Sequence, residues 1–139
     1  NARHGNIGAP IYVGGGRAHP PRPQDWSYRP PRQVRIGALR SALSMMVKEG
    51  RLTVVDKIAL DEIKTKKVVG ILEALSKASK TLVVDSKAND NLRLSIRNVE
   101  TSQFLPPEGV NVYDVLRHEH LVLSQDAVKA LEARCLEQK

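Results

Sequence analysis

TLVVD, residues 81–85, is the stretch from which the fold of this chain can be worked out. Its apolar and β-branched residues are followed by one acid, a pattern typical of a short strand that is covered on both faces. LTVVD at residues 52–56 has the same pattern, and HLVLS at residues 120–124 resembles it. The likeness reflects what a buried strand demands of its residues rather than an internal repeat. We expect strands at all three places and a fourth at about residues 101–105.

Helical spacing occupies the intervals between these strands. Apolar side chains recur on one face from about residue 32 to 49, and Gly50 is expected to end that helix. Thr65 is expected to cap a second helix, and Ser124 to cap the last one. Two shorter helical segments are expected at about residues 89–97 and 111–116. Because strands and helices alternate, we expect an α/β fold with three layers, in which a parallel sheet carries helices on both faces.

Residues 1–33 differ in composition from the rest of the chain. They hold six of the eight prolines and five of the nine glycines, and proline lacks the backbone donor that a helix interior needs. Of the formal net charge of +7, residues 1–35 contribute +5, from six arginines and one aspartate. We therefore expect an extended basic N-terminal arm at residues 1–33, rich in arginine, proline and glycine, and an α/β globular domain at residues 34–139.

The second half of the arm combines cations with aromatic rings in RAHPPRPQDWSYRPPRQVR, residues 17–35. Arginine matches phosphate and stacks on bases, while Trp26 and Tyr28 offer π-faces to unpaired nucleotides. Proline keeps the strand stiff, which lowers the entropy lost when it enters a crevice of folded RNA. These features favour RNA over DNA, since no element for the major groove is recognisable. A disordered, solvated basic tail and a proline-rich arm that docks on a protein groove are the alternatives.

Lysines also gather on the globular domain, at the start of the second predicted helix. Lys64, Lys66 and Lys67 lie where the helix dipole disfavours cations, and an anionic partner could offset that cost. Together with Arg93, Arg97 and Arg117 they are candidates for a second phosphate-contacting surface. An ordinary solvated face explains them equally well.

Acids at the ends of two strands suggest an alternative function, that of an enzyme. Asp56 and Asp85 follow buried strands, where open α/β folds place ligands, so a small nucleotide-binding or hydrolytic α/β enzyme is the alternative. The favoured interpretation is that these acids cap loops or face water, because the glycines of a dinucleotide site are missing.

Three other residues have chemistry that a catalyst or a metal centre could use. His118 and His120 are too few ligands for a convincing metal site, so a surface histidine pair is favoured. Cys135, the single cysteine, is interpreted as part of a core, on the apolar face of the last helix. We therefore expect no catalytic residue, no metal, no cofactor and no small-molecule substrate.

The chain shows no segment for membrane insertion. No apolar run approaches the roughly 18 residues of a membrane span, and the N-terminus lacks the hydrophobic stretch of a secretory signal. A cytoplasmic protein without a membrane partner is the expectation. Because the chain begins without methionine in loop-like sequence, we also expect a fragment or a processed product.

Five segments carry a resemblance to a known family. In chain order they are ARHGNIGAPIYVGGG, RPQDWSYRPPRQVRIGALRSALS, KTKKVVGIL, NLRLSIRNV and LPPEGVNVYDVLRHEHLVLSQDAVKALE. They resemble the bacterial form of the L four family of large-subunit ribosomal proteins. The resemblance implies a compact α/β domain on the large ribosomal subunit, with a long basic loop that passes through ribosomal RNA to the wall of the nascent-peptide exit tunnel. It also implies neighbouring ribosomal proteins as partners.

The resemblance adds positions to the expected RNA-binding residues. It places Arg3, His4 and Asn6 on the returning limb of the loop, and Arg40 on the first helix of the domain. The full expected set is Arg3, His4, Asn6, Arg17, His19, Arg22, Trp26, Tyr28, Arg29, Arg32, Arg35, Arg40, Lys64, Lys66, Lys67 and Arg97. Family members carry a further strand, a helix and the loop tip before the point where this chain begins, so the resemblance implies uncovered apolar surface beside the sheet.

Overall fold

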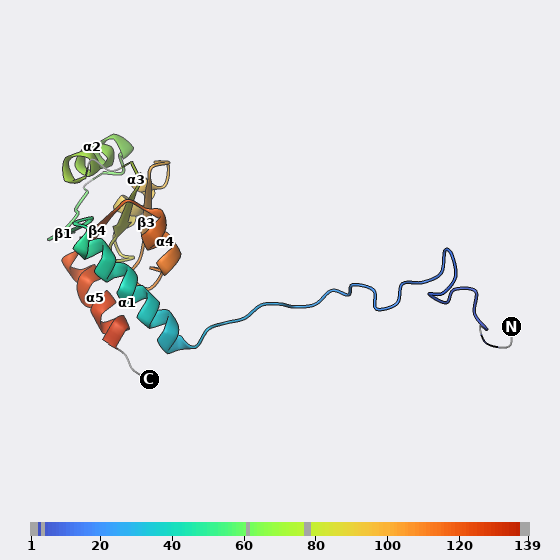
Figure 1. Ribbon diagram of the computed structural model, residues 1–139. Helices are drawn as coiled ribbons and strands as arrows, with labels where there is room; N and C mark the ends of the chain where they lie inside the picture. The colour runs from blue at the N-terminus through green and yellow to red at the C-terminus, as the bar shows by residue number, and fades with distance from the viewer. Residues whose placement is uncertain (1–2, 4, 61, 77–78, 137–139) are drawn as a thin grey trace.

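The structure is a computed structural model that describes residues 3, 5–60, 62–76 and 79–136. From residue 32 onward, helices and strands alternate along the chain (Figure 1). The helices are α1 (Arg32–Lys48), α2 (Thr65–Leu75), α3 (Asp90–Ile96), α4 (Val112–Arg117) and α5 (Gln125–Leu136). The strands are β1 (Leu52–Val55), β2 (Thr81–Val84), β3 (Ser102–Leu105) and β4 (His120–Ser124). The predicted order of elements is confirmed, and only the ends of some elements differ slightly.

The four strands form one sheet in the order β1-β4-β2-β3, and every pairing is parallel. The last strand of the chain, β4, lies between the first two, with Leu121 in register with Leu52 on one side and Leu82 on the other. This confirms the α/β fold with a parallel sheet. It also brings the carboxyl ends of β1, β2 and β4 to one edge of the sheet, beside one another.

Helices cover both faces of the sheet, as predicted. Successive residues of a strand point to opposite faces, so neighbours along β2 and β4 enter different cores. Leu82 and Leu121 pack in one core with side chains from α1, α4 and α5. Val83 and Val122 pack in a second core with side chains from α2 and α3. All four side chains are fully buried, which explains why the sequences of these strands are continuously apolar.

The first helix begins and ends where local chemistry requires. Pro31 is the N-cap of α1, where its missing N–H costs nothing because the first backbone donors of a helix have no partner within it. Its carbonyl oxygen accepts from the backbone N–H of Arg35. Gly50 follows α1 with φ of +66°, a left-handed conformation that favours glycine. The backbone N–H groups of Gly50 and Arg51 then donate to Val47 and Met46, which satisfies two carbonyl groups at the helix end.

One predicted helix cap is wrong and one is confirmed. Thr65 is the first helical residue of α2 rather than its cap, because the extended Lys64 occupies the cap position. The Lys64 side chain makes no capping hydrogen bond. Ser124 does cap α5: its Oγ atom accepts from the backbone N–H of Ala127 at 3.3 Å. The difference arises because Ser124 ends a strand directly at the helix, whereas an irregular segment leads into α2.

The expectation that residues 52–56 are covered on both faces is only partly met. Strand β1 is an edge strand, and Val54 keeps 50% of its surface exposed. Beside it lies an apolar hollow of about 470 Å³ whose wall includes Leu43, Val47 and Cys135. A strand at the edge of a sheet has a neighbour on one side only, so apolar surface there remains uncovered by the described residues.

The N-terminal segment runs away from the domain (Figure 1). The described residues before Arg32 contain turns and bends but neither helix nor strand, and nearly all of them are exposed. His19 has φ of +50°, the left-handed conformation that is unusual for a residue with a side chain. In the described part of the chain, no helix is long and apolar enough to cross a membrane.

Candidate nucleic-acid interface

The aromatic rings of the arm are displayed to solvent. Trp26 and Tyr28 keep 83% and 81% of their surface exposed. Arg17, Arg22 and Arg29, on the same segment, are exposed as well. Rings and guanidinium groups that pack on nothing in the domain are available for stacking and for contacts with phosphate. The structure therefore presents five of the predicted RNA-binding residues on one irregular segment before α1.

Asp25 organises the chain around the tryptophan. Its carboxylate Oδ1 accepts a hydrogen bond from the backbone N–H of Ser27 at 2.8 Å, which forms a local turn across Trp26. This backbone hydrogen bond, helped by the Ser27 side chain, lowers the pKa of Asp25 because it favours the charged form. The single acid of the arm thus has a local structural task, and the surrounding cations remain in excess.

Residues 5–16 form a compact loop near the end of the arm, and we call them the apolar loop. Asn6 belongs to the predicted set, and its side chain accepts from the backbone N–H of Gly8 at 2.9 Å. The loop closes where the backbone N–H of Gly16 donates to the carbonyl oxygen of Gly8 at 2.9 Å. Arg3 is exposed just before this loop, and His4 lies outside the described residues.

Arginines also mark the junction of arm and domain. Arg32 and Arg35 lie in the first turn of α1, where the structure places no acid. The N-terminal end of a helix carries partial positive charge, so cations are disfavoured there unless an anion lies nearby. Arg40 makes a contact within the domain: its guanidinium donates to the backbone carbonyl of Cys135 and so connects α1 to α5.

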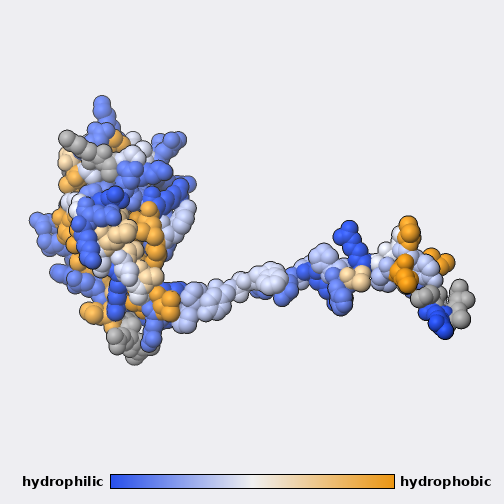
Figure 2. All heavy atoms as spheres, in the orientation of Figure 1, coloured by the Kyte–Doolittle hydropathy of each residue, from blue (hydrophilic) through white to orange (hydrophobic). Residues whose placement is uncertain are grey.

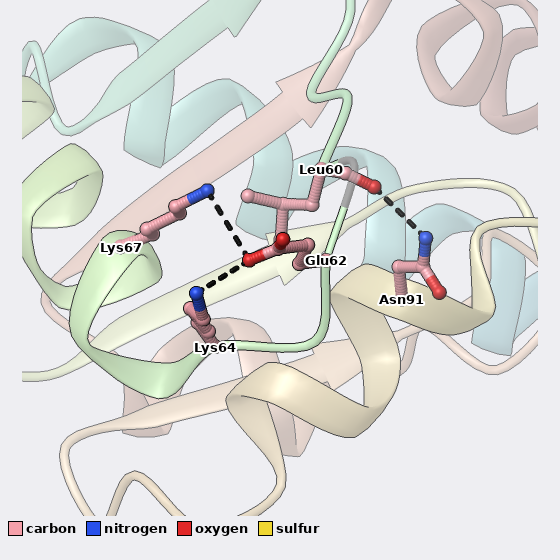
Figure 3. A network of polar contacts seen from close by, with 5 residues as sticks. All are labelled: Leu60, Glu62, Lys64, Lys67 and Asn91. Atoms are coloured by element: carbon pink, nitrogen blue, oxygen red, sulfur yellow. Dashed lines mark hydrogen bonds and ion pairs between the residues drawn. The ribbon is translucent and has the colours of Figure 1, made fainter.

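Two of the three predicted lysines share an acidic partner. Figure 3 shows Lys64 and Lys67 directed at Glu62, with Nζ to Oε2 distances of 2.5 and 3.8 Å. In the same view Asn91 of α3 donates to the carbonyl oxygen of Leu60 at 2.8 Å, which holds the segment before α2 against α3. These ion pairs are exposed, and Glu62 weakens the positive field of the lysines. Lys66 is exposed beside them.

The remaining cations of the domain do not share one surface. Arg97 and Arg93 line a hollow of about 470 Å³ next to β3, and Arg93 also pairs with Asp90 at 2.9 Å. Arg117 lies on α4, in the layer opposite α2 and α3, with its guanidinium 5.9 Å from the centre of the Tyr113 ring. Among these predicted cations, the lysines at the start of α2 and the arginines at the end of α3 lie in the same layer of the fold.

The two acids at the strand ends differ in burial and in the number of hydrogen bonds that they accept. Asp85 is buried, and its carboxylate accepts from Ser124 Oγ at 2.7 Å, Asn89 Nδ2 at 2.9 Å and the backbone N–H of Ser86 at 2.8 Å. Asp56 is exposed and accepts from Gln125 at 2.5 Å. Because Asp85 accepts hydrogen bonds on both oxygens, one of them from Ser124 at the end of β4, it joins β2 to β4.

The interpretation of residues 118 and 120 as a surface histidine pair is wrong. His118 is buried at the end of α4, and its Nδ1 atom donates to the carbonyl oxygen of Asp114 at 2.7 Å. His120 is half-buried, with Nε2 2.9 Å from Thr53 Oγ1, and burial lowers its pKa. The two side chains lie in different surroundings because His118 lies at the end of α4, whereas His120 is the first residue of β4. The described residues contain no cluster of three or more metal-binding side chains.

Cys135 packs against the core that contains α1 and α5, as predicted. The sequence analysis does not single out Ile7, Ile11 and Val13, whose side chains are largely exposed on the apolar loop. The sequence signal for them was the presence of three aliphatic residues among the glycines of residues 5–16. This segment is too short for the three side chains to bury one another. Periodicity could not find them, because the loop is neither helix nor strand.

Comparison with known proteins identifies relatives for nearly the whole chain. A sequence model of the ribosomal protein L4/L1 family matches residues 1–134. A Myxococcus xanthus protein named large ribosomal subunit protein uL4 is 48% identical over 131 residues, which make up 94% of this chain and 63% of the relative. Proteins of the same name from Rhizorhabdus wittichii and Natranaerobius thermophilus are 43% and 38% identical, over 96% and 94% of this chain and 64% and 63% of the relatives.

The match extends over both the arm and the domain, although the chain spans less than two thirds of the length of these relatives. Identities of 38% to 48% over more than nine tenths of the chain leave no doubt about common descent. This chain belongs to the ribosomal protein L4/L1 family.

Proposed function

We propose that this protein is a structural constituent of the large ribosomal subunit that binds ribosomal RNA through its arm, near the nascent-peptide exit tunnel. The names of its relatives support a ribosomal role. One structural observation carries the RNA-binding part: exposed arginines and two exposed aromatic rings lie on a segment that runs away from the described residues of the domain. Its partners would be large-subunit ribosomal RNA and neighbouring ribosomal proteins, in the cytoplasm.

The two parts of the chain would divide the work. The arm, residues 1–33, inserts into folded RNA, and the α/β domain, residues 34–139, fixes the direction in which the arm leaves. The arginines neutralise phosphates deep in the RNA, while Trp26 and Tyr28 stack on unpaired bases. The lysines of α2 and Arg97 would add weaker contacts at the surface, where Glu62 already offsets part of the charge. Catalysis has no part in this mechanism.

The salt dependence of RNA binding tests the electrostatic contribution. If four to six arginines contact phosphate, the logarithm of the association constant should fall with the logarithm of salt concentration with a slope of about −3 to −5. Filter binding of the full chain to deproteinised large-subunit RNA measures this slope. Replacement of Arg17, Arg22 and Arg29 by glutamine should reduce its size by about 2 to 3.

A matched control separates specific contacts from total charge. Lys48, Lys87 and Lys129 are exposed on the domain, outside the predicted set, and their replacement by glutamine removes the same charge. This control should leave the slope nearly unchanged. A wild-type slope close to zero, or equal effects of the two triple variants, would contradict the proposed role of the arm.

Trp26 tests the stacking contribution separately. Trp26→Ala should weaken RNA binding by about 1 to 3 kcal/mol, because the ring would no longer cover a base. The salt slope should not change, since no phosphate contact is removed. Trp26→Phe, which keeps a π-face, should recover most of the affinity. If Trp26→Ala binds RNA as tightly as the wild type, the ring has another task.

A further inference from the structure

Strand β3 leaves one edge of the sheet open. Strand β2 lies on one side of β3, and no strand of the described residues lies on the other. All four residues of β3 are half-buried, whereas all four residues of β2 are buried. A strand at the edge of a sheet presents backbone N–H and C=O groups that have no partner within the sheet. An extended polypeptide can pair with such a row of groups.

The pairing of β3 with β2 shows which backbone groups face the open edge. The carbonyl oxygen of Thr101 accepts from the backbone N–H of Thr81 at 2.9 Å, so the backbone of Thr101 faces β2. Successive residues of a strand face alternate sides, and the backbone groups of Ser102 and Phe104 therefore face away from β2. The N–H of Ser102 donates to the carbonyl oxygen of Val99 at 3.3 Å. This leaves the N–H of Phe104 as a donor at the open edge.

A hollow of about 470 Å³ borders the same edge. Helix α3 contributes Arg93 and Arg97 to its wall, and β3 contributes Gln103 and Phe104. Phe104 packs against the core that contains α2 and α3. Because side chains alternate along a strand, Gln103 points to the other face of the sheet, so the hollow extends across the edge of β3. A strand added at this edge would find space there for its side chains.

The charge of the hollow favours an acidic partner. Arg93 and Arg97 are exposed, and none of the described residues that line the hollow is acidic. Asp90 pairs with Arg93 at 2.9 Å, but both side chains are exposed, and such ion pairs are weak. Guanidinium groups bind carboxylates through two parallel hydrogen bonds. The net charge of +7 on the whole chain also attracts acidic molecules over longer distances.

A protein segment suits this surface better than RNA does. RNA could contact the two arginines but would leave the backbone groups of β3 unpaired, whereas an extended peptide can satisfy both. Figure 2 shows hydrophilic and hydrophobic residues interspersed on the visible face of the domain. Nucleic-acid interfaces are more polar and more positively charged than interfaces between proteins. A mixed surface with two arginines is therefore closer to a protein interface.

We infer that β3 and the hollow beside it form a docking site for an extended acidic segment of a partner protein, which adds to the sheet as a further strand. The backbone of Phe104 pairs with the added strand, and Arg93 and Arg97 contact its carboxylates. This goes beyond the proposed function, because it assigns a protein partner to the layer opposite α1, from which the arm leaves. Of these three residues, only Arg97 also belongs to the set expected to contact RNA.

Model peptides test this site with the full chain and without RNA. A fluorescein-labelled peptide of alternating glutamate and valine is titrated with the protein, and its fluorescence anisotropy is measured. In a strand this peptide places every glutamate on one face, as contact with the arginines requires. A peptide of alternating lysine and valine reverses the charge. A glutamate–valine peptide methylated on every backbone nitrogen keeps the charge and loses the donors for strand pairing.

The glutamate–valine peptide should bind, and the two comparison peptides should not. Arg93→Gln combined with Arg97→Gln should weaken binding about tenfold or more. Lys48→Gln combined with Lys129→Gln is the matched control, because it removes the same charge from exposed positions on α1 and α5 and should bind as the wild type does. In hydrogen-exchange measurements on the wild type, the amide of Phe104 should exchange more slowly once the peptide is bound.

Three results would overturn the inference. One is no binding of the glutamate–valine peptide at millimolar concentration, and another is binding without a change in exchange at Phe104. The third is equal weakening by the two double variants, which would assign binding to total charge. RNA titrations test the other class of partner: lost RNA affinity in the arginine variant with unchanged peptide binding would assign the hollow to RNA and refute the inference. Because the peptide titrations contain no RNA, their failure leaves the proposed function intact.

Discussion

Replacing Asp85 tests whether this acid at the end of β2 has a structural role. Asp85 is 7% exposed, and its carboxylate accepts three hydrogen bonds, from Ser124, Asn89 and Ser86. A hydrogen bond to a charged group contributes about 1.5 to 3 kcal/mol. The three do not add, because they share one carboxylate and its removal also relieves the cost of burying a charge. We expect Asp85→Ala to lower the free energy of unfolding by about 3 kcal/mol.

The assay is urea unfolding followed by far-ultraviolet circular dichroism. Tryptophan fluorescence would not report on the domain, since the only tryptophan, Trp26, is exposed on the arm. Asp56→Ala is the matched control: it removes an exposed acid from the end of β1, with an expected loss below about 1 kcal/mol. Asp85→Asn, which keeps one acceptor oxygen, should fall between the two. Equal unfolding midpoints for Asp85→Ala and Asp56→Ala would refute a structural role for Asp85.

Three further predictions concern Arg134, His120 and residues 17–31. Arg134 Nη1 donates to the carbonyl oxygens of Pro107 and Val110 at 2.8 and 2.9 Å, so Arg134→Ala should lower stability by about 2 kcal/mol in the same urea assay, and an unchanged midpoint would contradict this. Burial holds the pKa of His120 below its ordinary 6.5, so the unfolded chain binds a proton more readily. The stability that this shift contributes is present above about pH 6.5 and is lost as pH falls through the lowered pKa. Urea titrations of His120→Gln across this range should lack that decline; an identical pH dependence would show that other groups cause it. Residues 17–31 form neither helix nor strand, so their amides should exchange rapidly without RNA, and strong protection in hydrogen-exchange measurements would count against a mobile arm.

Local signals were sufficient for most of the secondary structure. Continuous apolar runs predicted β2 and β4, and both are buried on the two faces because helices cover the sheet on each side. Gly50 predicted the end of α1, since its left-handed φ closes the helix. Such signals fail where a residue suited to capping lies one position inside the helix, as Thr65 does at the start of α2.

The candidate interface was predictable in its composition but only partly in its arrangement. Arginines, prolines and the two aromatic residues of the arm could be identified from sequence because the segment cannot bury them. The hydrogen bond from Arg40 to α5 could not be foreseen, since it joins residues 95 positions apart. The hydrogen bond from Gly16 to Gly8 that closes the apolar loop is likewise not visible in the sequence.

By itself, the sequence determined the order of strands and helices, the contrast in composition between residues 1–33 and the rest of the chain, and the resemblance to the family. These depend on short-range chemistry: periodicity, backbone donors and charge. Only the tertiary structure decided that β4 lies between β1 and β2, that Val54 is left at an edge, and that Ser124 meets Asp85. The physical reason is that parallel pairing joins segments far apart in the chain, and its order depends on which arrangement buries the most apolar surface at once.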